Sequence, residues 1–214
     1  YPLLGGLFCL SCSDDEQDTG TKQPTTAGEV TFGVDLTGFS TRVTQDGSSW
    51  NDGDKIGTYV LDMKTLEPAT EAANVPYVCS EEGASVSFTS TTPLKVQNDG
   101  TPVKFVAYYP YNADVRNLNY PVQLAAQERG STACDLLYAA TKEEYSPENE
   151  PHISLNFTHR LAKVILKFVN MEKEPLEVSD VRIEGMQTAA SFNIQTDVLT
   201  VDESSVATIT PYHN

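Results

Sequence analysis

Apolar and polar residues alternate along much of this chain, which is the pattern of half-buried β-strands. The clearest case is residues 30–36, where Val30, Phe32, Val34 and Leu36 share one face and polar residues or glycine occupy the other. Further strands are predicted at 56–61, 75–79, 86–89, 94–96, 103–111, 136–139, 153–169, 176–183, 191–194 and 206–209. Short strands with frequent turns predict an all-β fold, an antiparallel sandwich or barrel.

Two places carry a more specific prediction. Asn98, Asp99 and Gly100 separate the strand at 94–96 from the one at 103–106, and Asp-Gly favours a tight hairpin turn. Residues 155–169 also fit helical spacing, but their β-branched residues favour a strand. The apolar phase of that strand slips by one residue after Leu161, as a β-bulge would require.

The N-terminal residues have the pattern of a bacterial lipoprotein signal. An apolar run ends at Ser11 and Cys12, and acidic residues follow at once. This order predicts cleavage before Cys12 and attachment of lipid to that cysteine. The alternatives are a transmembrane anchor or a buried strand. Roughly 10 apolar residues are, however, too few to cross a bilayer core, which needs about 20.

The organisation of the chain follows from these patterns. Residues 1–11 are predicted to be a partial signal peptide and 12–28 a disordered acidic tether, because the latter lack apolar residues to bury. Residues 29–170 are predicted to form an N-terminal β-sandwich domain. Residues 171–214 are either its final strands or the start of a truncated second β domain.

The composition of the chain limits the classes of molecule that it is expected to bind. The formal net charge is −16, which argues against nucleic acid because phosphate binding depends on Lys and Arg. No segment after the signal is apolar enough to span a bilayer. Without Cys9 and Cys12, the cysteines left are Cys79 and Cys134, which can form a disulfide in an exported protein or stay as two buried thiols.

The sequence offers no set of residues for catalysis, so we predict neither an enzyme nor a bound cofactor or metal. None of His152, His159 and His213 lies in a metal-binding pair or beside a nucleophile motif. His159 is instead predicted to be a partly buried strand residue.

Two acidic segments are predicted to be structural. Residues 51–54 faintly resemble a calcium loop but lack its later ligands, so they predict a turn before the next strand. A second cluster predicts a solvated loop and consists of Glu143, Glu144, Glu148 and Glu150.

Tyr108, Tyr109 and Tyr111 crowd around Pro110. The strand alternation places Tyr109 and Tyr111 on the same side as Phe105, which predicts core packing. The alternative is an exposed aromatic platform for glycans, and hence a surface glycan-binding lipoprotein.

Five segments, in this order along the chain, resemble the fimbrillin family, the exported pilin-like lipoproteins of Bacteroidales. They are 32–44 with Thr41, Arg42 and Val43; 50–59 with Gly53, Asp54, Ile56 and Gly57; 105–111; 135–139; and 157–166 with His159, Arg160, Leu161, Ala162 and Lys163. The resemblance covers roughly residues 12–210. It implies transthyretin-like β-sandwich domains with Greek-key connections.

The resemblance also implies a role. Fimbrillins form, tip or anchor fimbriae on the outer membrane surface in adhesion, which implies other fimbrial subunits as partners and a host or bacterial surface ligand. A trypsin-like protease removes the first strand, and a neighbouring subunit fills the groove by strand addition. Arg42 matches the place of the processing arginine; the alternative is a surface arginine in a loop.

At both ends the chain departs from the family, although one acidic stretch near its start resembles a family signal. The acidic residues that follow Cys12 resemble the signal that sends such lipoproteins to the outer face. Family members usually continue into a second full domain, so this chain is expected to be either a fragment or a short member.

Overall fold

The computed structural model describes residues 28–35, 49–70, 73–96, 100–127, 134–142, 145 and 152–212. Within these residues the extended elements are β-strands and no α-helix is present, which confirms the predicted all-β class. The strands are β1 Gly28–Glu29, β2 Thr31–Asp35, β3 Lys55–Asp62, β4 Val75–Cys79, β5 Ser85–Thr89, β6 Lys95–Val96, β7 Val103–Tyr109, β8 Asn119–Gln123, β9 Leu137–Ala140, β10 His152–Asn156, β11 Thr158–His159, β12 Ile183–Gln187, β13 Ala189–Asn193, β14 Val198–Val201 and β15 Val206–Ile209. None of the described residues forms a helix that could reach across a lipid bilayer.

The main body is an eight-stranded sheet in the order β10-β2-β5-β4-β3-β7-β9-β11. Adjacent strands in this sheet are antiparallel, except for β10 and β2, which are parallel. β10 and β11 stand at opposite ends of this order, yet Phe157 alone separates them in the chain. The sheet therefore curls around a core, and Phe157 is buried there with its ring 5.3 Å from that of Trp50.

The central strands β3 and β7 are buried on both faces. Phe105, Ala107 and Tyr109 of β7 belong to the first core, inside the curled sheet, whereas Val106 and Tyr108 belong to a second core on its other side. A strand that is covered on both faces has a nearly continuous apolar sequence, as β7 does with VKFVAYY.

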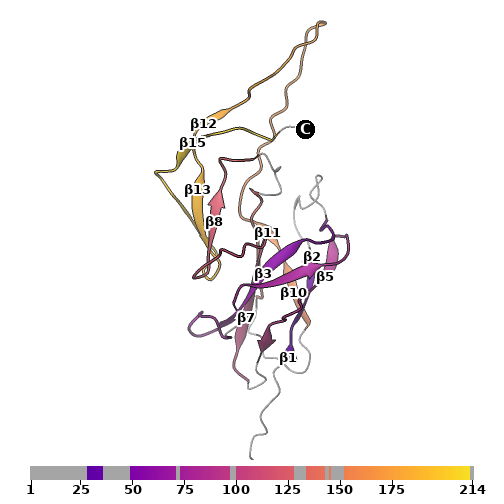
Figure 1. Cartoon of the computed structure of the whole chain (residues 1–214), viewed down its shortest axis with the longest axis vertical. Helices are drawn as coiled ribbons and strands as arrows, with labels where there is room; N and C mark the ends of the chain where they lie inside the picture. Colours follow the sequence, from indigo (N-terminus) through magenta and orange to yellow (C-terminus); the bar gives the residue numbers. More distant parts are fainter. Residues whose placement is uncertain are drawn as a thin grey trace, which may run out of the picture.

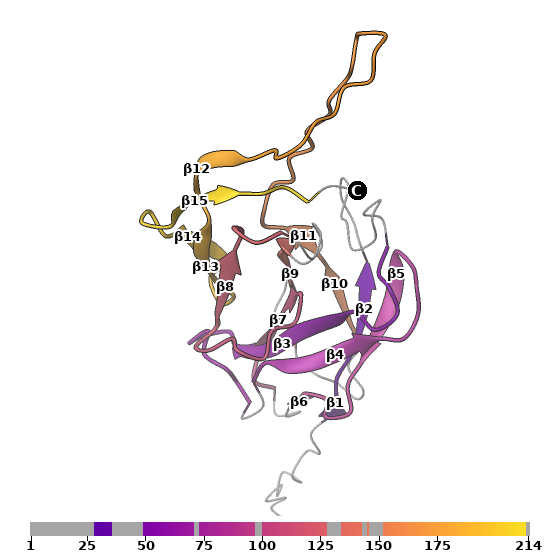
Figure 2. The same ribbon diagram turned by 45° about the horizontal axis from the view of Figure 1, so that its top comes forward.

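The second core is covered by a small sheet in the order β14-β13-β8, with Phe192 and Ile194 fully buried in it. An antiparallel pair of strands, β12 with β15, lies beside this sheet (Figure 1). Figure 2 shows these C-terminal strands grouped on one side of the larger sheet. β8, from the middle of the chain, thus shares a sheet with strands some 70 residues later, with Asn119 opposite Asn193.

The predicted strands at 153–169 and 176–183 are wrong over most of their length. The chain is extended only to His159, and residues 162–182 form no regular element before β12. A strand needs a neighbour to bond its backbone groups. Within the described residues, no strand pairs with this segment. Its high β propensity is therefore not enough to make it a strand, and the predicted bulge, which needs a paired strand, does not form.

The predicted hairpin at 98–100 is wrong in its pairing. Residues 97–99 lie outside the described residues, while Gly100 has the positive φ of 78° that Asp-Gly turns require. β6, however, pairs with β1 instead of β7. The pairing is completed by an ion pair between Lys95 and Glu29 at 3.7 Å.

The turn predicted at 51–54 is confirmed. Asp54 accepts the backbone N–H of Asn51 at 2.7 Å and the Tyr109 hydroxyl at 3.2 Å. Burial raises the pKa of Asp54, and these hydrogen bonds oppose the rise. The carboxylate thus orders the chain at the start of β3.

Candidate functional site

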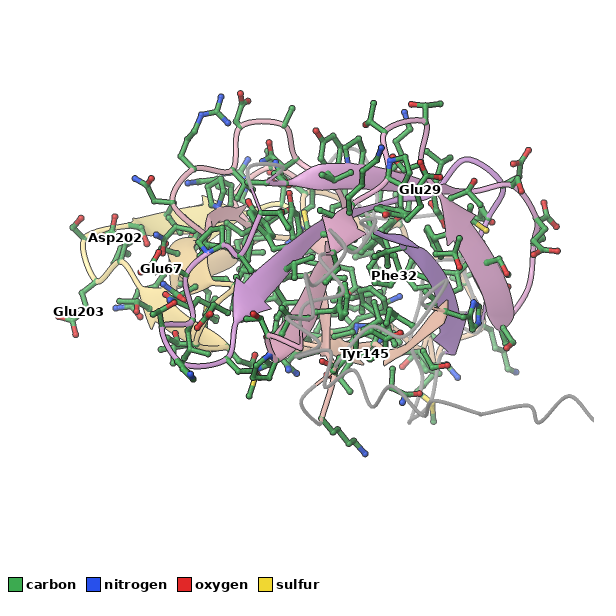
Figure 3. The ribbon with its side chains drawn as sticks, turned by 90° about the horizontal axis from the view of Figure 1, so that it is seen from below. Glu29, Phe32, Glu67, Tyr145, Asp202 and Glu203 are labelled. Carbon is green, nitrogen blue, oxygen red and sulfur yellow. The ribbon has the colours of Figure 1, made fainter. Side chains whose placement is uncertain are left out.

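The first long strand occupies a groove in the sheet. β2 lies between β5 and β10, and its alternate side chains Phe32 and Val34 are 0% and 1% exposed, with Val30 just before it at 0%. The Phe32 ring makes edge contacts with Tyr77 at 4.8 Å and with Phe105 at 5.9 Å. Figure 3 shows Phe32 among the packed side chains inside the sheet. We call the space between β5 and β10 that β2 fills the first-strand groove.

Tyr77 fastens this strand to the core. Its hydroxyl donates to the carbonyl of Val30 at 3.0 Å and accepts the N–H of Leu94 at 2.8 Å. The N–H of Val30 donates in turn to the carbonyl of Leu94 at 3.0 Å. Burial raises the pKa of Tyr77 to about 12, so the phenol keeps its proton, and can donate to Val30, at higher pH than an exposed tyrosine would.

The predicted processing and lipid sites cannot be placed beside this groove. Arg42, in the stretch 36–48 between β2 and the rest of the sheet, lies outside the described residues, and so does Cys12. Their roles remain predictions. The four glutamates of the predicted acidic loop also lie outside the described residues.

A second candidate surface is the segment 162–182, which we call the apolar arm. Figures 1 and 2 show it as an orange loop that projects away from the sheets. Its large apolar side chains are between 48% and 88% exposed and are Val164, Ile165, Leu166, Phe168, Val169, Met171, Leu176 and Val178. Exposed apolar side chains gathered in one segment usually mark a protein contact.

The segment His159-Arg160 connects the two parts of the molecule. His159 Nδ1 lies 2.6 Å from Asp135 Oδ1, at the end of β11. Arg160 makes a two-pronged contact with Asp197, through Nε at 2.5 Å and Nη2 at 2.7 Å, and its guanidinium lies 5.0 Å from the Tyr138 ring centre. The prediction that His159 is a partly buried strand residue is confirmed. Asp135, the partner of His159, and Asp197, the partner of Arg160, lie too far away in sequence for a local pattern to predict these contacts.

Replacing Arg160 with alanine is expected to lower the free energy of unfolding by about 1 kcal/mol, because a half-buried, two-pronged ion pair and a cation–π contact are lost. Urea unfolding measures this loss. Arg182→Ala is the matched control, since its pair with Asp180 is well exposed and should contribute little. An equal loss in both variants would contradict this role for Arg160.

Two of the three clustered tyrosines pack into the cores, as predicted for Tyr109, whereas Tyr111 is half-buried and lies outside both cores, contrary to the prediction. Tyr108 is 0% and Tyr109 8% exposed, so these two rings cannot form the exposed platform on which the glycan-binding alternative depended. Tyr108 lies across Gly57 of β3, where a Cβ would collide with the ring. The glycine of the 50–59 segment therefore makes room for this tyrosine.

The cysteines occupy different surroundings. Cys79 is buried in the first core and its thiol donates to the carbonyl of Glu81 at 2.8 Å. The Cys134 thiol donates to the carbonyl of Ala126 at 3.7 Å. The disulfide between them stays a prediction. Within the described ranges, no three His, Cys, Asp or Glu side chains are grouped to hold a metal ion.

A family model described as fimbrillin-like matches residues 41–214. Among solved structures, a candidate cell adhesion protein of Bacteroides uniformis is similar over 90% of this chain and 72% of its own, with 25% identity and a TM-score of 0.63. A fimbrial protein of Bacteroides ovatus is similar over 64% of this chain and 29% of its own, with 18% identity and a TM-score of 0.37. A candidate cell adhesion protein of Bacteroides thetaiotaomicron matches over 86% and 68%, with 12% identity and a TM-score of 0.46. No curated protein matches the sequence.

Proposed function

This chain belongs to the fimbrillin-like family, and we propose that it is a cell-surface fimbrial subunit whose first-strand groove accepts a strand from a neighbouring subunit. The observation that carries the proposal is the burial of β2 between two strands of one sheet. Its role in adhesion is supported by the likeness to the cell adhesion protein of B. uniformis.

Loss of β2 would create a site for strand addition. The ladders on β5 and β10 would lose their partners, and the pocket of Phe32 beside Tyr77 and Phe105 would open to water. Exposed backbone groups and apolar surface both favour the entry of another extended segment. Cleavage after Arg42 would cut the covalent link between β2 and the later strands of the sheet, leaving β2 held by non-covalent contacts alone.

The lipid and the apolar arm complete the proposal. Lipid on Cys12 would tether the subunit to the outer membrane, with its acidic residues keeping it exposed at the surface. Residues 171–214 would begin a second β domain. Its further strands would cover the exposed side chains of the apolar arm, which spans the predicted boundary.

Treatment of the intact protein with a trypsin-like protease is expected to cut after Arg42 and to yield oligomers that persist in size-exclusion chromatography. Cleavage opens the groove only when the fragment carrying β2 leaves. A synthetic peptide of residues 28–36 should refill the groove and block oligomer formation, whereas the same composition in scrambled order should not. Mass spectrometry of the fragments identifies the cut.

Arg42→Gln is the control for this experiment, because it removes the cleavage site without touching the described sheet. The variant should stay uncut at this position and monomeric. Wild-type protein that is cut after Arg42 but remains monomeric would contradict strand exchange. Lipid-free Cys12 in the protein from native cells would contradict the membrane tether.

A further inference from the structure

A cleft lies on the far side of the sheet from the first-strand groove. It is open to solvent, has a volume of about 640 Å³, and is lined by the turn after β3, the segment 111–118 after β7 and Gln195 from the turn between β13 and β14. This volume is within the range of small-ligand sites, about 300–1,000 Å³. Figure 3 shows Glu67, at its edge, close to the yellow C-terminal strands. We call it the Tyr59 cleft.

The walls of the Tyr59 cleft are fixed by hydrogen bonds. The Tyr108 hydroxyl donates to Asn74 Oδ1 at 2.6 Å, and the Asn74 side chain donates to the carbonyl of Asn112 at 2.9 Å. On the opposite wall, Gln195 Nε2 donates to the carbonyl of Leu66 at 2.7 Å. The cleft therefore joins three distant segments in one defined shape.

Backbone strain gathers at the same place. Among the described residues, six non-glycine residues have positive φ, and four of them line or adjoin the Tyr59 cleft, with φ between 50° and 59°: Leu66, Asn74, Asn117 and Leu118. The conformation is unfavourable for a residue such as leucine. Strained residues of this kind are enriched at ligand sites, where surrounding contacts hold them in place.

The lining combines aromatic rings with groups that donate and accept hydrogen bonds. Two tyrosines line the cleft: Tyr59, which is buried, and Tyr111, which is half-buried. Arg116 is exposed, and its Nη1 is held by the carbonyls of Ala113 at 2.7 Å and Val115 at 3.0 Å. Its remaining N–H groups and the carboxylate of exposed Glu67 supply donors and acceptors at the edge of the cleft.

These groups suit a neutral sugar better than a charged ligand. A sugar ring presents hydroxyls that both donate and accept, together with C–H faces that pack on aromatic rings. The residues that line the cleft include one acidic and one basic side chain, Glu67 and Arg116, so their formal charges sum to zero. The chain as a whole carries −16, which repels polyanions. We propose that the Tyr59 cleft binds a neutral oligosaccharide segment, through stacking on Tyr111 and hydrogen bonds to Arg116 and Glu67.

The test is binding of the intact chain to an array of immobilised neutral, sialylated and sulfated oligosaccharides, followed by calorimetry with the strongest neutral binder. We expect Tyr111→Ala, Arg116→Gln and Glu67→Gln each to weaken binding about tenfold, which corresponds to about 1.4 kcal/mol. Tyr111→Phe keeps the ring and should retain most of the affinity. Thermal unfolding of each variant verifies that it is folded. Since Arg116 and Glu67 are exposed, their variants stay informative if Tyr111→Ala does not fold.

Matched controls lie outside the cleft. Tyr212→Ala and Arg182→Gln change an exposed tyrosine and an exposed arginine, and both should leave binding within about twofold. Absence of binding to every neutral oligosaccharide would overturn the proposal. So would binding that the cleft variants leave unchanged, or a preference for the sialylated or sulfated forms. The result is independent of oligomer formation, which uses the first-strand groove.

Discussion

Replacing Phe32 with alanine is expected to lower the free energy of unfolding by about 3–5 kcal/mol, the usual cost of a large cavity in a packed core. The Phe32 ring is fully buried and contacts two aromatic rings, Tyr77 and Phe105. β2 is held on both sides by backbone ladders, so its neighbours have little freedom to collapse into the space. The cost should therefore lie in the upper part of that range.

Equilibrium urea unfolding, followed by circular dichroism, measures this change. Phe168→Ala is the matched control, because the same atoms are removed from a side chain that is 61% exposed. It should change the free energy of unfolding by no more than about 0.5 kcal/mol. A comparable loss in both variants would mean that β2 does not fill the groove in solution.

The same substitution has a consequence for assembly. Phe32→Ala weakens the resident strand without changing the walls of the first-strand groove. After protease treatment, the shortened side chain should let the fragment leave faster, so that oligomers appear sooner than with wild type. Slower or unchanged oligomer formation would argue against departure of β2 as the controlling step.

Raising the pH from about 10 to about 12 is expected to unfold the protein cooperatively. Burial raises the pKa values of Tyr59, Tyr77, Tyr120 and Tyr138 from the ordinary 10 to about 12. The folded state holds these protons more tightly than the unfolded state. The stabilisation is thus fully present below pH 10 and is lost as pH rises towards 12.

Tyrosinate absorbance and circular dichroism, recorded on the same samples, test this expectation. Both signals should change together, because the buried phenols ionise when the chain unfolds. Tyr138→Phe is informative, since within the described residues the Tyr138 hydroxyl is buried without a hydrogen-bond partner. This variant should be at least as stable at neutral pH and should lose stability less steeply above pH 10. Ionisation of all tyrosines near pH 10 with an unchanged circular dichroism spectrum would contradict burial.

Period-two alternation was sufficient to predict most of the large sheet. The buried faces of β2 and β4 follow directly from residues such as Val34 and Tyr77, because one face of each strand meets the first core. β4 and β15 have the predicted bounds. β8 was missed because Pro121 discourages a strand; it is tolerated since β8 pairs with β13 alone and forms the edge of its sheet.

The remaining errors come from contacts that no local window contains. Val164 and Ile165 have strong β propensity, yet propensity alone cannot supply the neighbouring ladder that a strand needs. The Tyr59 cleft is assembled from segments more than 100 residues apart, as the bond from Gln195 to Leu66 shows. The polar residues of the cleft have no regular spacing along the chain, so no sequence motif could predict the cleft. The strands could therefore be predicted from the sequence, because their pattern is local, whereas the Tyr59 cleft could not, because it depends on contacts between distant segments.

The position of β2 also has a mechanical consequence. Its ladders run along both sides, parallel with β10 and antiparallel with β5. A force applied upstream of residue 28, along the strand direction, loads all of these hydrogen bonds at the same time, in shear. They would therefore have to break together and could not open one after another. A subunit tethered at its N-terminus would then resist tension at the very strand that the proposed protease cut would set free.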